Sequence, residues 1–108
     1  MTEISLGEFE EVAMLTVAIL HDNAYTISII NELDERLGRK VSIGAIQTVL
    51  RRLEEKGMLK SKFGEATSVR GGKRKRYFKL TSLGSKVLRE TKEQRMSLWN
   101  AIPKLSFS

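Results

Sequence analysis

The feature that most constrains the fold is an amphipathic helix pattern followed at once by two strand-like stretches that flank a basic glycine loop. The helix pattern is VSIGAIQTVLRRLEEKG at residues 41–57, and the strand-like stretches are MLKSKFGEA at 58–66 and RKRYFKLT at 74–81. Gly71-Gly72 lies between the strands and gives the turn its flexibility. The order predicts a recognition helix followed by a charged hairpin of residues 58–81, called the wing below.

The helix of residues 42–56 has one apolar and one polar face. Ser42 is a suitable N-cap, and Gly57 is expected to end the helix. Helical spacing predicts a buried stripe of Ile46, Val49, Leu50 and Leu53. The polar face carries Gln47, Thr48, Arg51, Arg52 and Glu55. Gly44 and Ala45 are small residues in the first turn, where they allow close approach to a partner and where helix amides favour phosphate.

Two further helices are predicted before this one. Residues 8–21 are apolar on nearly every side, which predicts a buried helix. Residues 25–37 are expected to bury a stripe of Ile27, Ile30, Leu33 and Leu37 and to end at Gly38. The fold class is therefore mainly α with a small β-hairpin (α+β), and residues 1–81 are expected to form one compact domain.

A fourth helix is predicted from Ser82 to about Ala101, after the N-cap Thr81 and before Pro103. Its apolar positions have little of their own domain left to cover them, and a second copy of the chain is the simplest cover. Residues 82–108 are therefore expected to form a dimerisation helix and tail. The residues predicted at the interface are Leu83, Val87, Thr91, Leu98, Trp99 and Ile102, with Leu105 in the tail.

Charge is distributed unevenly along the chain. Residues 1–35 hold eight acids and no Lys or Arg, whereas residues 36–79 hold fourteen bases and three acids. A basic middle segment that carries the wing favours a polyanionic partner, nucleic acid before anionic membrane. The alternative is a basic surface that serves only solubility.

Catalytic and metal chemistry is poorly supported. The chain has no cysteine and one histidine, which excludes thiol nucleophiles and disfavours a metal site. His21, at a helix end, suits the dipole there better than a general-base role. Asp34 and Glu35 are adjacent on a helix and point apart, so they cannot share a substrate. We expect no enzyme activity and no cofactor. With neither a long apolar run nor a signal-like start, we also expect a cytoplasmic protein without membrane contact.

The sequence resembles the PadR-like family of transcriptional regulators over residues 6 to 90. The supporting stretches are LGEFEEVAMLTVAIL, DNAYTISIINEL, VSIGAIQTVLRRLEEKGML and GGKRKRYFKLTSLG. The resemblance implies a winged helix-turn-helix with a C-terminal dimerisation helix, and a repressor that binds a palindromic operator as a homodimer. Two positions depart from the family pattern, which usually has Tyr where this chain has Gln47 and Gly where it has Thr26.

A DNA-binding function places the contacts on the recognition helix and the wing. The predicted DNA-binding residues are Tyr25, Ser42, Gly44, Ala45, Gln47, Thr48, Arg51, Arg70, Lys73, Arg74 and Lys75. Some members of the family respond to small planar compounds, which implies a possible effector between two copies of Trp99; the alternative is that Trp99 only anchors the dimer.

A winged helix can also contact protein or RNA, and the fold alone does not separate these uses. Binders of single-stranded RNA usually expose aromatic platforms, and here Phe63, Tyr77 and Phe78 are the aromatic residues near the basic segment. A preference for duplex over single strands would discriminate.

Overall fold

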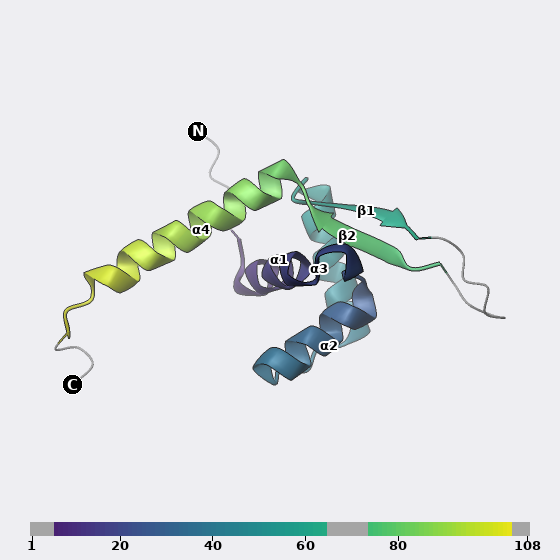
Figure 1. The fold of residues 1–108 in the computed structure, drawn as a ribbon, viewed down its shortest axis with the longest axis horizontal. Coiled ribbons are helices and arrows are strands. Elements are labelled where there is room, and N and C mark those ends of the chain that lie inside the picture. Colours follow the sequence, from purple (N-terminus) through teal and green to yellow (C-terminus); the bar gives the residue numbers. More distant parts are fainter. Residues whose placement is uncertain (1–5, 65–73, 105–108) are drawn as a thin grey trace.

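The computed structural model describes residues 6–64 and 74–104, and within them the chain forms helices and one β-hairpin. The elements are α1 (Glu8–Leu20), the short 3-10 turn η1 (His21–Asn23), α2 (Thr26–Leu37), α3 (Ile43–Glu55), β1 (Leu59–Phe63), β2 (Arg76–Leu80) and α4 (Ser82–Ala101). Figure 1 shows α1, α2 and α3 gathered in the middle, while the hairpin and α4 extend toward opposite ends. The predicted winged-helix order is confirmed.

The wing is an antiparallel pair whose register runs from Leu59 opposite Leu80 to Phe63 opposite Arg76. Directly opposed residues share a face, so the pair Leu59–Leu80 and the buried Phe78 lie on the face that covers the core. The strands are shorter than the predicted stretches 58–66 and 74–81, since β1 spans Leu59–Phe63 and β2 spans Arg76–Leu80. Residues 65–66 of the predicted first strand lie outside the described residues.

The core is built by all three helices of the middle group, the base of the wing and the first half of α4. Its fully or almost fully buried side chains include Met14, Val17, Ile29, Leu33, Ile46, Leu50, Leu53, Met58 and Leu59. The stripe predicted for α3 is confirmed in full, since all four of its members are buried. The polar face of α3 is thereby directed outward.

Two of the predicted burial patterns were wrong. In α1, Leu15 and Ile19 are 44% and 50% exposed, because neighbouring elements cover only part of the helix circumference. In α2, Ile27 and Leu37 are exposed, and the core face runs instead through Ile29 and Leu33. Positions four apart lie nearly in line on a helix, whereas positions six apart are separated by about 120° around it, so the proposed stripe did not follow one face.

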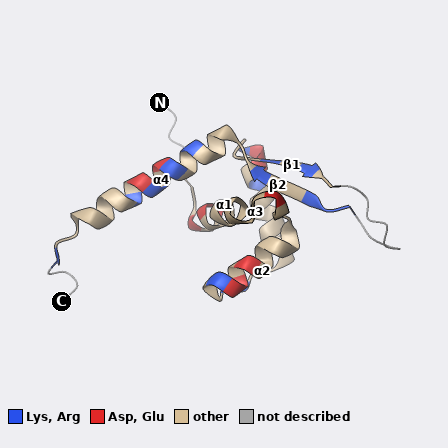
Figure 2. Cartoon of the chain, in the orientation of Figure 1, with Lys and Arg blue, Asp and Glu red and all other residues tan. Residues whose placement is uncertain are grey.

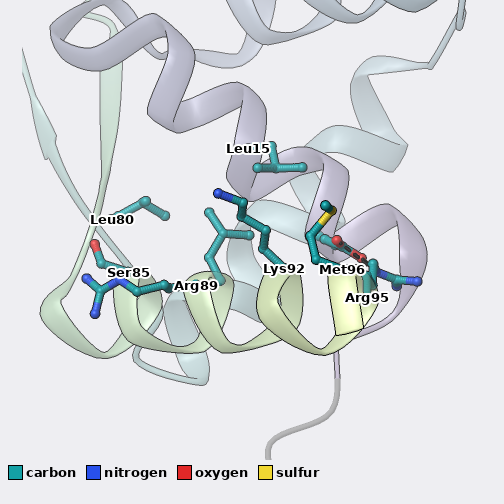
Figure 3. A pocket seen from close by; sticks show the side chains of 9 residues that line it. Leu15, Leu80, Ser85, Arg89, Lys92, Arg95 and Met96 are labelled. Carbon is teal, nitrogen blue, oxygen red and sulfur yellow. Dashed lines mark hydrogen bonds and ion pairs between the residues drawn. The ribbon is translucent and has the colours of Figure 1, made fainter. Parts of the chain in front are cut away.

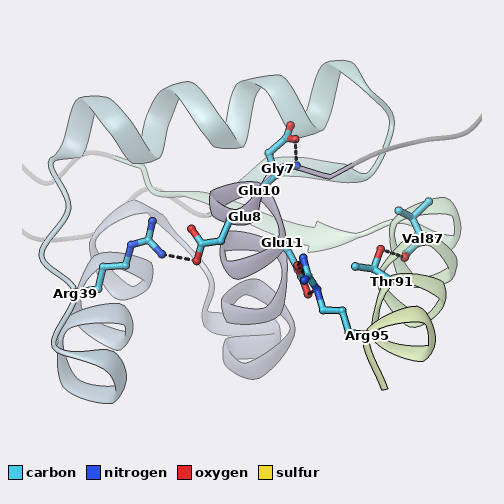
Figure 4. Close-up of polar contacts among 8 residues, drawn as sticks. All are labelled: Gly7, Glu8, Glu10, Glu11, Arg39, Val87, Thr91 and Arg95. Carbon is cyan, nitrogen blue, oxygen red and sulfur yellow. Dashed lines mark hydrogen bonds and ion pairs between the residues drawn. The ribbon is translucent and has the colours of Figure 1, made fainter. Parts of the chain in front are cut away.

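The acidic first turn of α1 connects α1 to three separate parts of the chain. Glu8 accepts a hydrogen bond from Arg39 at 2.8 Å, and Glu11 accepts one from Arg95 on α4 at 2.6 Å (Figure 4). Glu10 accepts hydrogen bonds from the Gly7 amide at 2.9 Å and from Lys56 at 2.7 Å. These glutamates therefore join α1 to the end of α2, the end of α3 and α4.

Glu10 is ionised in an almost buried position, with a side chain 9% exposed. Burial opposes its charge, but hydrogen bonds from Lys56 and the Gly7 amide, with the charge of Lys56, hold the pKa of Glu10 below its ordinary 4.5. A lowered carboxyl pKa contributes stability that is present above the unfolded pKa and is lost as pH falls through the folded one.

We expect Lys56→Met to lower the free energy of unfolding by about 1 kcal/mol at pH 7, since Lys56 is partly exposed and solvent screens the pair. The difference from wild type should shrink as pH falls below 4.5 toward the folded pKa of Glu10. Chemical denaturation at several pH values measures it. Arg51→Met is the control, because the Arg51–Glu55 pair is 70% exposed on both sides and 3.9 Å long. A difference that is constant with pH would contradict the assignment.

The start of α4 lies directly on the backbone that leads into β1. The Thr81 side chain caps α4 by accepting a hydrogen bond from the Gly84 amide at 2.9 Å and donates one to the Gly57 carbonyl at 2.6 Å. A Cβ at Gly84 would lie 2.1 Å from the Met58 carbonyl oxygen. Only glycine fits there. Gly38 and Gly57 have positive φ angles of 63° and 78° where α2 and α3 end, as predicted for both glycines.

In the described part of the chain, no single helix is long and apolar enough to cross a membrane; the bent pair of residues 8–23 and α2, with 119° between them, meets the length and composition limits only jointly.

Candidate nucleic-acid interface

The outward face of α3 presents the residues that the sequence predicted. Ser42 caps the helix by accepting a hydrogen bond from the Ala45 amide at 3.1 Å. Gly44 has no atom within 4 Å of the position where a Cβ would lie, so the first turn is open to an approaching partner. The predicted α3 residues Ser42, Gly44, Ala45, Gln47, Thr48 and Arg51 are all exposed.

The described part of the wing carries further exposed cations. Arg74 and Lys75 are exposed. The Arg74 Nε donates to the Gly64 carbonyl at 2.7 Å, and its guanidinium lies 5.7 Å from the ring centre of Phe63. Arg70 and Lys73, together with Gly71-Gly72, lie outside the described residues.

Tyr25 connects the start of α2 to the first half of β2 and to the residue just before it. Its ring meets that of Tyr77 edge to face at 5.6 Å between centres, and the Lys75 ammonium lies 4.3 Å from the Tyr25 ring centre. A Cβ at Gly64 would lie 2.6 Å from the Tyr77 ring, so glycine there leaves room for this cluster. Half-buried Tyr25 therefore orients a cation of the wing, a contact that the sequence did not indicate.

Ion pairs divide the basic residues into two groups. Lys56, Arg76, Lys79 and Arg95 each contact a carboxylate within 3.1 Å. The hydrogen bond from Lys79 and the charge of His21 hold the pKa of Asp22 below its ordinary value, which keeps the partner of Lys79 ionised. Among the described residues, no ion pair involves Lys60, Lys62, Arg74 or Lys75. In the described part of the wing most cations are thus outside ion pairs, and Figure 2 shows the blue of Lys and Arg along both strands.

Sequence reasoning missed a hydrogen-bonded group between α3 and the wing. Ser61 of β1 donates to Glu54 at 2.6 Å, and Arg76 of β2 donates both to Ser61 at 2.8 Å and to Glu54 at 3.1 Å. No spacing rule links these positions, because a helix, a strand and its partner strand supply one residue each. The only signal was an acid on α3 close to the start of a basic hairpin.

The residues predicted at a dimer interface do not share one environment. Leu98, Trp99 and Ile102 are exposed by 73%, 59% and 38%, and Leu83 by 39%. The Thr91 hydroxyl donates to the Val87 carbonyl of its own helix at 2.8 Å (Figure 4). Val87 is 6% exposed and packs in the core of its own chain. The first half of α4 therefore contributes to that core.

A groove of about 470 Å³ lies between α1 and α4, and no pattern in the sequence indicated it. Leu15, Leu80, Leu88 and Met96 form its apolar part (Figure 3). Arg89, Lys92 and Arg95 on α4 form a cationic rim. The exposed side of α1 is therefore one wall of a concave surface, called the α1–α4 groove below.

No group of three or more His, Cys, Asp or Glu side chains in the described residues is arranged to hold a metal ion.

Comparisons with known proteins agree on one family. The model of the transcriptional regulator PadR-like family matches residues 14–90. The fold is similar to a PadR-like transcription factor from Bacteroides fragilis, with 30% identity and a TM-score of 0.72 over 85% of this chain and 84% of that one. It is also similar to a PadR family regulator from Eggerthella lenta, with 28% identity and a TM-score of 0.69 over 91% and 85%.

A more distant similarity is to Bacillus subtilis PadR, whose structure was determined in complex with operator DNA. Identity is 17% and the TM-score is 0.61, over 90% of this chain and 53% of that one. A search among curated proteins found no match.

Proposed function

Because this chain belongs to the PadR-like family of transcriptional regulators, we propose that it is a repressor that binds a palindromic operator as a homodimer. Family membership makes it a regulator and not an enzyme. The proposal adds the mode of binding: the start of α3 enters the major groove, and the wing cations neutralise phosphates beside it. Its place of action would be the cytoplasm, where its DNA target lies.

The observation that carries the proposal is the exposed polar face of α3, which adjoins β2 in a wing whose described cations are mostly outside ion pairs. Gln47 and Thr48 lie near the start of α3, where base edges would be reached, whereas Arg51 lies a turn later and suits the backbone. DNA can come close to the start of α3, because the residues there are the small Ser42, Gly44 and Ala45. Tyr25 holds Lys75 over the same side. The fold shared with a PadR crystallised on operator DNA supports this arrangement.

Selection from a random duplex library tests the proposal. The full-length protein is expected to enrich an inverted repeat whose half-sites lie about 34 Å apart, one helical turn, and to prefer the duplex over either single strand. Placing the enriched sequence in a promoter should then lower transcription when the protein is present. Enrichment of no duplex, or a preference for single-stranded RNA, would contradict DNA recognition.

The proposed dimer uses the exposed end of α4 and the α1–α4 groove. The exposed end carries Leu98 and Ile102, and the groove offers Leu15 and Met96. Val87 is left out of the interface because its own core covers it. One apolar helix end and one apolar groove per chain suit a two-fold arrangement in which each copy fills the groove of the other.

We expect Leu98→Asp to weaken dimerisation at least tenfold, a change of about 1.4 kcal/mol, because a carboxylate would enter an apolar contact. Sedimentation equilibrium at micromolar concentration measures it. Lys86→Asp is the matched control, since Lys86 is exposed on the half of α4 that packs on its own domain. A wild-type monomer at that concentration, or equal behaviour of the two variants, would show that this surface does not pair.

We also propose that a small planar effector releases the protein from its operator. Trp99 is 59% exposed near the end of α4, so two copies could approach each other across the dimer axis. Titration of planar phenolic and polyaromatic compounds should quench tryptophan fluorescence and weaken operator binding. No quenching, together with a monomeric Trp99→Ala variant, would leave Trp99 as a dimer anchor alone.

A further inference from the structure

Glu54 closes a ring of hydrogen bonds that joins α3 to both strands of the wing. One carboxylate oxygen accepts from the Ser61 hydroxyl at 2.6 Å and the other from the Arg76 guanidinium at 3.1 Å. The Arg76 Nε donates to Ser61 at 2.8 Å, which completes the ring. The Glu54 side chain is 30% exposed, whereas that of Arg76 is 51% exposed, so the carboxylate is the more enclosed partner.

The ring lies within the candidate DNA-facing surface. Glu54 and Arg76 line a shallow crevice of about 320 Å³ whose other walls include Gln47, Arg51 and Thr26. A carboxylate in this position repels the phosphates of an approaching duplex, which costs affinity unless a cation offsets it. Arg76 is that cation, and the ring holds it against Glu54 with two donors in fixed directions.

We propose that Glu54 is a positioning residue for sequence recognition: it fixes the wing relative to α3 and keeps Arg76 from binding phosphates indiscriminately. The inference rests on the proposed DNA binding and adds the source of its selectivity. A guanidinium tied to Glu54 is not free to bind phosphates, so it adds little to binding of arbitrary DNA. A free one would strengthen binding to any duplex, because phosphate contacts carry no sequence information. A wing held at one angle to α3 favours duplexes whose shape brings bases and phosphates into register together.

The neighbouring residue provides a matched control. Glu55 is on the same helix and carries the same charge, but it is 70% exposed and lies 3.9 Å from Arg51 without a hydrogen-bonded ring. Removing either carboxylate raises the net charge equally. A general electrostatic effect is therefore common to both variants, and only the loss of the ring is specific to Glu54.

The experiment compares the affinity for a duplex enriched by the wild-type protein with the affinity for a scrambled duplex of the same length. We expect Glu54→Ala to bind the scrambled duplex about threefold more tightly and the enriched duplex more weakly, so the ratio falls about tenfold, or about 1.4 kcal/mol. On scrambled DNA, the slope of log affinity against log salt concentration should become steeper by about 0.9 for each released Arg76 that binds a phosphate. Glu55→Ala should leave the ratio unchanged.

Two further variants keep the test decisive. Ser61→Ala opens the ring without a change of charge and should lower the ratio in the same direction, so the inference does not depend on how well Glu54→Ala folds. In an Arg76→Ala background, Glu54→Ala should have a smaller effect on the ratio, because Glu54 then acts only through its hydrogen bond with Ser61. Equal ratios for Glu54→Ala and Glu55→Ala, or an undiminished effect without Arg76, would overturn the inference while DNA binding stands. A wild-type protein that enriches no duplex would instead refute the proposed function.

Discussion

Gly84→Ala is expected to lower the free energy of unfolding by about 3 kcal/mol or more, a large part of the stability of a small domain. The added methyl group would lie 2.1 Å from the Met58 carbonyl oxygen and 3.0 Å from its carbonyl carbon, both of which are backbone atoms that cannot rotate away. Relief requires α4 to move, which also strains the hydrogen bond from the Thr81 amide to the same carbonyl at 3.0 Å. Thermal unfolding at fixed protein concentration should show a Tm lower by about 12 °C or more.

Gly44→Ala is the control for the Gly84 variant. Gly44 is also in the first turn of a helix, but no atom lies within 4 Å of its Cβ position. Alanine has the higher helix propensity, so this variant should equal the wild type or gain up to about 1 kcal/mol. If both variants unfold at the wild-type temperature, the close contact between α4 and Met58 does not exist in solution.

Replacing Lys73, Arg74 and Lys75 together with alanine is expected to weaken binding to every duplex by about a hundredfold or more at physiological salt. Four or five phosphates per half-site give a wild-type dimer a log–log salt slope of roughly −7 to −9, and each lost phosphate contact removes about 0.9 of it. The three substitutions in two subunits should therefore flatten the slope by up to about 5. Binding measured between low and physiological salt, on enriched and scrambled duplexes, tests both expectations.

The matched control removes three cations from α2, α4 and the segment after α4 instead. Arg36, Lys86 and Lys104 are exposed and change the net charge by the same amount when replaced with alanine. Their loss should leave the slope nearly unchanged, because the proposed DNA surface lies on α3 and the wing. An unchanged slope in the wing variant would place the wing off the DNA.

The sequence predicted elements whose signals are local. It predicted that Ser42 and Thr81 cap helices, that Gly38 and Gly57 end them, and that the stripe of α3 is buried. These features could be predicted because each depends on residues within one or two turns. The stripe in α2 was wrong where the spacing left the helical period, and the exposed Leu15 of α1 could not be foreseen. How much of an apolar helix its neighbours cover depends on packing, which no single segment encodes.

In the candidate site, too, local features could be predicted from the sequence and contacts between distant segments could not. The exposed face of α3 follows from its helical period, so the exposure of Gln47, Thr48 and Arg51 could be predicted from the sequence alone. The ring of Glu54, Ser61 and Arg76 could not, because it needs the register of the wing and its angle to α3. The packing of Val87 in the core of its own chain could not be predicted either, because the sequence does not reveal how far along α4 that core reaches.

The contact of Gly84 with Met58 also determines how far the other end of α4 moves when the helix tilts. The α4 helix has 20 residues, so it is about 30 Å long at 1.5 Å per residue. The hydrogen bond from Arg95 to Glu11 holds α4 at a second point. The end of α4 projects away from the rest of the domain (Figure 1). A tilt of about 10° at Gly84 would move the far end by about 5 Å. In the proposed dimer the far end meets the partner, so the helix acts as a lever whose fulcrum is a glycine. A small tilt at that point therefore becomes a displacement of several ångströms at the far end, and it changes the distance between two recognition helices, which must match a DNA repeat of about 34 Å.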